Sequence, residues 1–167
     1  INQSGTGIAG SIYANTLILG SSDGGTNKPS VNLTTSTNYI NQVQASNLSS
    51  LSLANAQNLT VNSSGVSATG AVSLSATGNL SVNGSIATSG GDVLLKATGN
   101  LVQAASTSIS TGGGDVTYWS NAGGTAGYIQ LGTGVSVTTG GGDIVLGGGS
   151  TNPLTGYATG TADTLFT

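Results

Sequence analysis

The sequence repeats at intervals slightly longer than 20 residues, and each repeat carries apolar side chains at every second position. The segment Asn58–Asn62 (Asn-Leu-Thr-Val-Asn) returns 21 residues later as Asn79–Asn83 (Asn-Leu-Ser-Val-Asn). The segment Ser85–Val93 returns as Ser108–Val116 and again as Ser136–Ile144. Alternation with a period of two is typical of β-strands that are buried on one face. A repeat of this length with short strands predicts a solenoid in which every repeat forms one coil.

Alignment of the repeats gives the register of the coils. In a parallel β-helix, corresponding residues of successive coils stack, and those that point inward form apolar columns. The positions between them carry small or polar residues, as outward positions should. The sequence therefore predicts an all-β, right-handed parallel β-helix (β-solenoid) with roughly 21–28 residues per coil. The residues expected in the inward columns are Ile86, Val93, Leu95, Ile109, Val116, Tyr118, Val137, Ile144 and Leu146.

Glycine-rich segments ending in Asp separate the strands of the repeats. Glycine adopts the positive φ values of a tight turn at low steric cost, and the Asp carboxylate is expected to accept hydrogen bonds from its own turn. We expect a single β-helical segment over 1–167, with regular coils over 58–149 and a loop at 120–127. Residues 150–167 are expected to form a terminal coil or linker.

The first third of the chain, residues 1–57, is less regular and is expected to form irregular coils. Its expected strands are Gly10–Gly20, Val31–Leu33, Tyr39–Ala45 and Leu48–Ala56. Natural solenoids close their ends with polar caps, and neither end of this sequence carries an amphipathic cap. We therefore expect the chain to be part of a longer or polymerising protein, whose partner is itself, by continuation or by head-to-tail stacking.

The charge content excludes several classes of function. Charged residues make up 4% of the chain, as two Lys and five Asp, and the sequence has no His and no Cys. Nucleic-acid binding needs many basic residues, and zinc sites need His or Cys. A histidine-based catalytic mechanism is impossible. No apolar run reaches the roughly 18 residues of a membrane-spanning helix. We expect a secreted or surface-exposed protein that is not an enzyme and holds no cofactor.

Three carboxylates occupy equivalent positions of three successive repeats, namely Asp92, Asp115 and Asp143. Such a column could bind Ca²⁺ between coils or supply the paired acids of a glycoside hydrolase. Stacked carboxylates repel each other, however, and the basic groups of such enzymes are absent. We favour a structural role at the turns, with Ca²⁺ binding as the weaker alternative.

Trp119 and Lys96 fall at the same outward position of neighbouring coils. The indole is expected to pack against the lysine stem or ammonium. A sugar-stacking platform is the alternative and would make both residues ligand contacts. A second binding hypothesis concerns ice, because hydroxyl arrays on a flat β-helix face can match it. The array consists of Ser85, Ala87, Ser108, Ser110, Ser136 and Thr138, with Thr88, Thr111 and Thr139 at the corner.

The run Gly78–Gly149 resembles the repeat regions of filamentous-haemagglutinin-like adhesins, the large exoproteins of two-partner secretion. The motifs that carry the resemblance are Thr77–Ile86, Gly91–Ala97, Thr111–Asp115 and Thr139–Asp143. The resemblance implies a β-helical shaft, export to the bacterial surface, and a part in adhesion or biofilm, with host-cell or matrix glycans and proteins as partners. We therefore expect the structural shaft of an adhesin or extracellular filament, with an ice-binding or polysaccharide-binding solenoid as the alternative.

Overall fold

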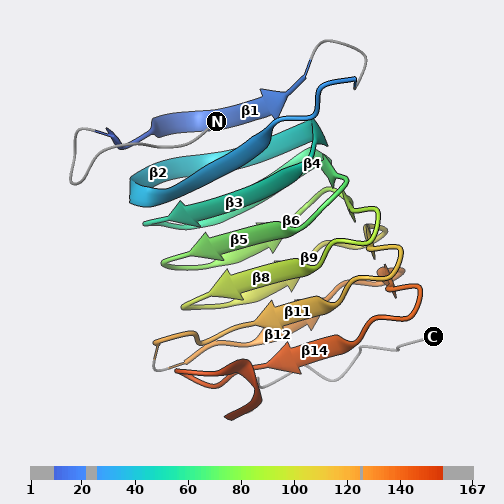
Figure 1. Cartoon of the computed structure of the whole chain (residues 1–167). Coiled ribbons are helices and arrows are strands. Elements are labelled where there is room, and N and C mark those ends of the chain that lie inside the picture. Colours follow the sequence, from blue (N-terminus) through green and yellow to red (C-terminus); the bar gives the residue numbers. More distant parts are fainter. Residues whose placement is uncertain (1–9, 22–25, 125, 156–167) are drawn as a thin grey trace.

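The computed structural model describes residues 10–21, 26–124 and 126–155, which form a stack of short β-strands (Figure 1). A short 3-10 helix, η2 (Pro153–Thr155), follows the last strand. In chain order the strands are β1 (Tyr13–Gly20), β2 (Ser30–Leu48), β3 (Ser50–Asn55), β4 (Leu59–Ala68), β5 (Val72–Ala76), β6 (Leu80–Val82), β7 (Ile86–Ala87), β8 (Val93–Ala97), β9 (Leu101–Gln103), β10 (Ser108–Ser110), β11 (Val116–Trp119), β12 (Ile129–Leu131), β13 (Ser136–Thr138) and β14 (Ile144–Gly147).

Each coil crosses three faces, and its strands pair in parallel with the strands of neighbouring coils. Face A consists of the first part of β2, followed by β3, β5, β8, β11 and β14. Face B consists of β1, the middle of β2, the first part of β4, and then β6, β9 and β12. Face C consists of the ends of β2 and β4, followed by β7, β10 and β13.

The winding of the coils is visible in Figure 1. The strands of face A run leftward at the front, face B lies behind them, and the coils descend from β1 to β14. This path is a right-handed parallel β-helix, so the fold predicted from the repeat is confirmed. Backbone groups of each coil are satisfied by the coils above and below, which is the requirement that buried strands must meet.

In the coils from β6 onward, the length of a coil changes because residues are inserted at two corners. The register is 21 residues where Leu101 pairs with Leu80, and it becomes 23 where Ile109 pairs with Ile86. It becomes 28 where Ile129 pairs with Leu101, so the second insertion lies between β11 and β12. That insertion folds back on the preceding coil, since the Ala122 amide donates to the Ala97 carbonyl at 2.9 Å.

Inward side chains of successive coils form continuous columns, and four of these columns run from β1 or β2 to β12, β13 or β14. Two columns lie behind face A, one behind face B and one behind face C. They consist of Val31–Leu51–Val72–Val93–Val116–Ile144, Leu33–Leu53–Leu74–Leu95–Tyr118–Leu146, Leu17–Val43–Val61–Val82–Gln103–Leu131 and Leu19–Ala45–Val66–Ile86–Ile109–Val137. Among the expected core residues, Ile86, Val93, Leu95, Ile109, Val116 and Tyr118 are at most 1% exposed.

The last three expected core residues are aligned with their columns but are not buried. Ile144 is 42% exposed, Leu146 is 38% exposed, and Val137 is half-buried. Their place in the columns is confirmed, but the expectation that Ile144 and Leu146 are buried in the core is wrong, and Val137 packs against the core only in part. These residues belong to the last described strands of faces A and C, so a coil covers them on one side only.

Glycine is required at the corner that leads into face A, for two different reasons. Gly113 has a φ of 131°, a conformation that other L-residues rarely adopt. A Cβ on Gly114 would lie 2.5 Å from the backbone of Gly91 in the coil before it. The first glycine turns the chain and the second allows the coils to approach, which explains the repeated Gly-Gly-Asp.

The first third is more continuous than expected. The two strands expected over Val31–Leu33 and Tyr39–Ala45 are parts of one strand, β2, which bends where its register shifts between Leu33 and Asn38. Asn38 and Asn55 are buried at this corner, where Asn55 donates to the Ile40 carbonyl at 2.9 Å and accepts from its amide at 2.8 Å. These asparagine side chains satisfy a bent backbone inside the helix, and the repeat pattern did not reveal them.

Candidate functional site

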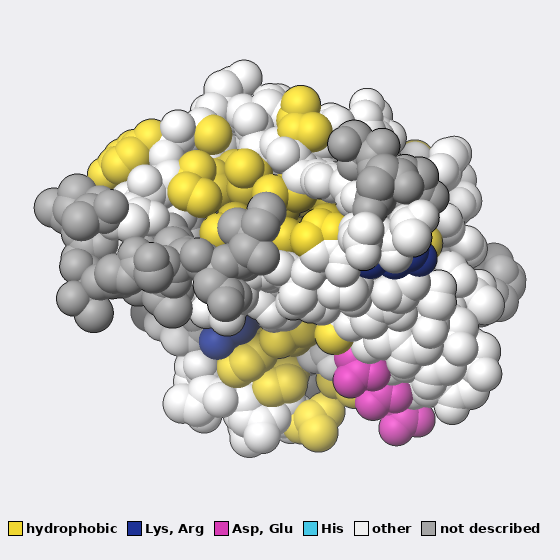
Figure 2. Space-filling model, turned by 45° about the horizontal axis from the view of Figure 1, so that its top comes forward, with side chains coloured by type: hydrophobic (Ala, Val, Ile, Leu, Met, Phe, Trp, Pro, Cys, Tyr) yellow, Lys and Arg dark blue, Asp and Glu magenta, His cyan; other side chains and the backbone are white. Residues whose placement is uncertain are grey.

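The three aspartates form a ladder along the corner between faces C and A, and Figure 2 shows such side chains in a row. The Asp92 carboxylate accepts the Asp115 backbone amide at 2.9 Å, and the Asp115 carboxylate accepts the Asp143 amide at 2.8 Å. Each carboxylate was expected to accept hydrogen bonds from its own turn. In the structure, the carboxylates of Asp92 and Asp115 instead accept the backbone amide of the next coil. The side chains are exposed, and water therefore weakens the repulsion between them.

The aspartate ladder offers little to a metal ion. One oxygen of both Asp92 and Asp115 is already engaged by a backbone amide. Across residues 10–21, 26–124 and 126–155, no group of three or more acidic side chains is close enough to hold a metal. Calcium needs six to eight oxygen ligands, which a single row of separated carboxylates does not bring together.

A second ladder runs along the corner between faces A and B, and a single contact of the same kind lies between faces B and C; the repeat pattern did not reveal either. At the corner between faces A and B, the backbone amide of Asn79 donates to the Asn58 side-chain oxygen at 2.8 Å. The backbone amide of Asn100 donates to the Asn79 side-chain oxygen at 2.9 Å. At the corner between faces B and C, the Ser85 hydroxyl accepts the Ser108 amide at 3.0 Å. The same contact, from a side chain to the backbone of the next coil, therefore occurs at all three corners. The 21-residue recurrence of Gly-Asn-Leu was the signal that could have indicated it.

Trp119 and Lys96 lie together on face A, as their spacing predicts. The Lys96 ammonium lies 4.3 Å from the centroid of the indole ring. The indole N–H donates to the Gly149 carbonyl at 2.6 Å, and the ring is half-buried. One face of the ring and its polar edge are therefore engaged within the protein, which favours local packing over a sugar platform.

Face C carries the hydroxyl array considered for ice binding. Ser85, Ser110, Ser136 and Thr138 are exposed on it, with Ala87 between them. The corner threonines add little to this surface, because Thr88 is 7% exposed, Thr111 is fully buried and Thr139 is half-buried. The Thr111 hydroxyl contacts the Gly114 carbonyl of its own turn and the Thr139 carbonyl of the next coil. The array is thereby reduced to serine, alanine and one threonine.

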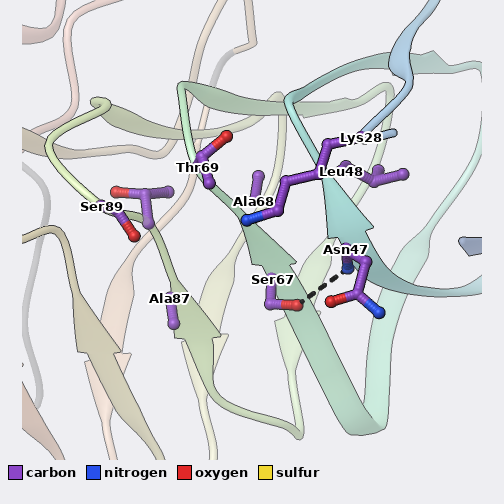
Figure 3. A pocket seen from close by; sticks show the side chains of 9 residues that line it. Lys28, Asn47, Leu48, Ser67, Ala68, Thr69, Ala87 and Ser89 are labelled. Carbon is purple, nitrogen blue, oxygen red and sulfur yellow. Dashed lines mark hydrogen bonds between the residues drawn. The ribbon is translucent and has the colours of Figure 1, made fainter. Parts of the chain in front are cut away.

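A shallow hollow lies at the corner between faces C and A, near the first coils (Figure 3). Among its described lining residues, Lys28 is the ionisable one, and Asn47, Ser67, Thr69 and Ser89 supply polar groups around a volume of about 170 Å³. The Asn47 backbone amide donates to the Ser67 hydroxyl at 3.3 Å. These described lining residues include no acid–base pair.

The buried polar pair of the interior is Tyr118 and Gln103. The Tyr118 hydroxyl donates to the Gln103 side-chain oxygen, and both residues are at most 1% exposed. Burial raises the pKa of the Tyr118 phenol far above its ordinary value. The group therefore stays protonated, and its contact stabilises the core without opening to any ligand.

Comparison with protein-family models, curated proteins and solved structures gave no match. The resemblance to haemagglutinin-like repeats therefore remains an expectation from the motifs. Within the described residues, no helix is long and apolar enough to span a membrane.

Proposed function

We propose that this chain is a length of the stiff shaft of a secreted bacterial surface adhesin or extracellular filament. The main observation is that side chains at the corners bond to the backbone of the next coil, as an asparagine ladder, an aspartate ladder and a single serine contact. A mechanical support needs such contacts along its axis and needs no reactive group. The resemblance of Gly78–Gly149 to haemagglutinin-like repeats supports the same role and a location at the cell surface.

The parallel backbone pairing between coils supports a shaft for a second reason. Every regular coil repeats the same backbone pairing, so that length can be added or removed in units of one coil without a new kind of contact. Stability of such repeats is approximately a sum over neighbouring coils.

Removal of one complete coil tests this proposal. Deletion of Val72–Asp92 joins β4 to β8 in the original register, because Val72 pairs with Val93. We expect a folded protein that small-angle scattering finds shorter by about 4.8 Å, the spacing of neighbouring strands. Deletion of Val72–Val82 removes a partial coil and is expected to unfold the protein. A globular particle, or unfolding on removal of the complete coil, would refute the shaft.

Binding of ice or of a polysaccharide is the alternative function, and the exposed hydroxyls of face C would serve it. Thermal hysteresis in the purified protein would favour ice binding. Retention on a glycan that is lost in Trp119→Ala would favour a carbohydrate module. Either result would replace the shaft proposal with a binding function.

A further inference from the structure

The two ends of the β-helix expose strand edges and apolar side chains. At one end lies β1, with the start of β2, and at the other end lie β12, β13 and β14. Within the part of the chain that the structure describes, these strands pair with a neighbour on one side only. Unpaired parallel edges favour the addition of further strands. In Figure 2, hydrophobic side chains gather on the end that carries β1.

The order of the faces is complementary between the ends. After β14 on face A, a continuing coil would pass next over faces B and C. The strand β1 crosses faces B and C and is followed by β2 on face A. A second copy placed below β14 therefore continues this order of faces, with its β1 on β12 and β13 and its β2 on β14 as far as Gly147, where η2 lies.

The interior columns match across this junction. Continuing in register the four columns that run the whole length pairs an apolar residue with an apolar residue in each of them. From the first copy to the second, the pairs are Leu131 with Leu17, Val137 with Leu19, Ile144 with Val31, and Leu146 with Leu33. The exposed fractions of 42% for Ile144 and 38% for Leu146 mark apolar surface that this contact would cover.

We propose that a second copy of this chain docks head to tail on the end formed by β12, β13 and β14. This inference rests on the proposed shaft function and names its partner. The outward column of face A that begins at Asn32 passes through Leu94 and ends at Val145. The docked register therefore places Val145 of one copy next to Asn32 of the other, at about 4.8 Å between Cα atoms, which a disulfide can span.

Cysteine cross-linking tests the junction, because the sequence contains no cysteine of its own. Asn32→Cys and Val145→Cys proteins are mixed, oxidised and separated on a non-reducing gel. We expect a disulfide-linked heterodimer that exceeds both homodimers and increases with protein concentration. In the matched control, Leu94→Cys replaces Val145→Cys, because Leu94 lies in the same column in the middle of the shaft. The control should give only background linkage.

Leu146→Lys supplies a second measurement, because its side chain is already partly exposed and the coil is expected to fold. Added to Val145→Cys, it should reduce the heterodimer to the level of the control. Linkage no greater than the control, or unaffected by Leu146→Lys, would overturn the proposal. Closure of this end by another segment of the chain would also give linkage at the control level. Scattering from the same proteins reports separately whether the shaft proposal stands.

Discussion

The Tyr118–Gln103 pair provides a sharp test of the column register. Gln103 interrupts the apolar column behind face B, at a position where the coil before it has Val82. Tyr118 occupies a position of the second face A column where the coil before it has Leu95. The two departures from the repeat meet in the core, where one hydrogen bond joins them. Gln103→Val and Tyr118→Phe should therefore be costly singly and tolerated together.

The expected magnitudes follow from burial. Gln103→Val leaves the Tyr118 hydroxyl without its acceptor, and Tyr118→Phe leaves the Gln103 oxygen without its donor. An unsatisfied buried polar group costs about 1–3 kcal/mol of unfolding free energy. The double variant removes both groups, and we expect its stability to lie within about 1 kcal/mol of the original. The coupling energy should then be about 1–3 kcal/mol.

Urea unfolding followed by far-UV circular dichroism measures the four free energies. Gln130→Val is the matched control, because Gln130 is exposed on β12 and its replacement should change stability by less than about 0.5 kcal/mol. Additive losses in the double variant would refute the pairing. A harmless Gln103→Val single variant would show that position 103 does not face the core.

Three further predictions concern pH, the ladder and the open end. Burial raises the Tyr118 pKa, so above about pH 10 the folded state keeps a proton that the unfolded state loses. The free energy of unfolding should therefore fall by up to about 1.4 kcal/mol per pH unit in that range. Urea unfolding of Tyr118→Phe at alkaline pH should lack this slope. Asp115→Asn keeps an acceptor oxygen and should preserve the melting temperature. Asp115→Ala removes the acceptor and should lower the free energy of unfolding by less than about 1.5 kcal/mol. A rise in melting temperature with added calcium would contradict the structural role of the ladder. Ile109→Ala should lower the free energy of unfolding, measured in urea, by about 2–5 kcal/mol. Ile144→Ala, measured in dilute protein, should lower it by about 1 kcal/mol, because no closed cavity forms. Equal losses would contradict the open end.

Much of the candidate surface could be anticipated from spacing alone. The Asp92, Asp115 and Asp143 column and the Lys96–Trp119 contact follow from counting residues between equivalent turns. The direction of a corner side chain could not be counted in this way. Thr111 turns inward because its hydroxyl reaches two carbonyl groups, one of which belongs to the next coil.

The sequence by itself determined the class of the fold and the register of its regular coils. The alternation of apolar residues and their recurrence every 21–28 residues can be read from the sequence without knowing which residues are neighbours in space. Only the tertiary structure decided that Asn38 and Asn55 enter the core, that Gln103 accepts the Tyr118 hydroxyl, and that corner side chains bond to the backbone of the next coil. The reason is physical: a polar side chain is buried or exposed according to the partners that other coils bring to it, and those partners are distant in sequence.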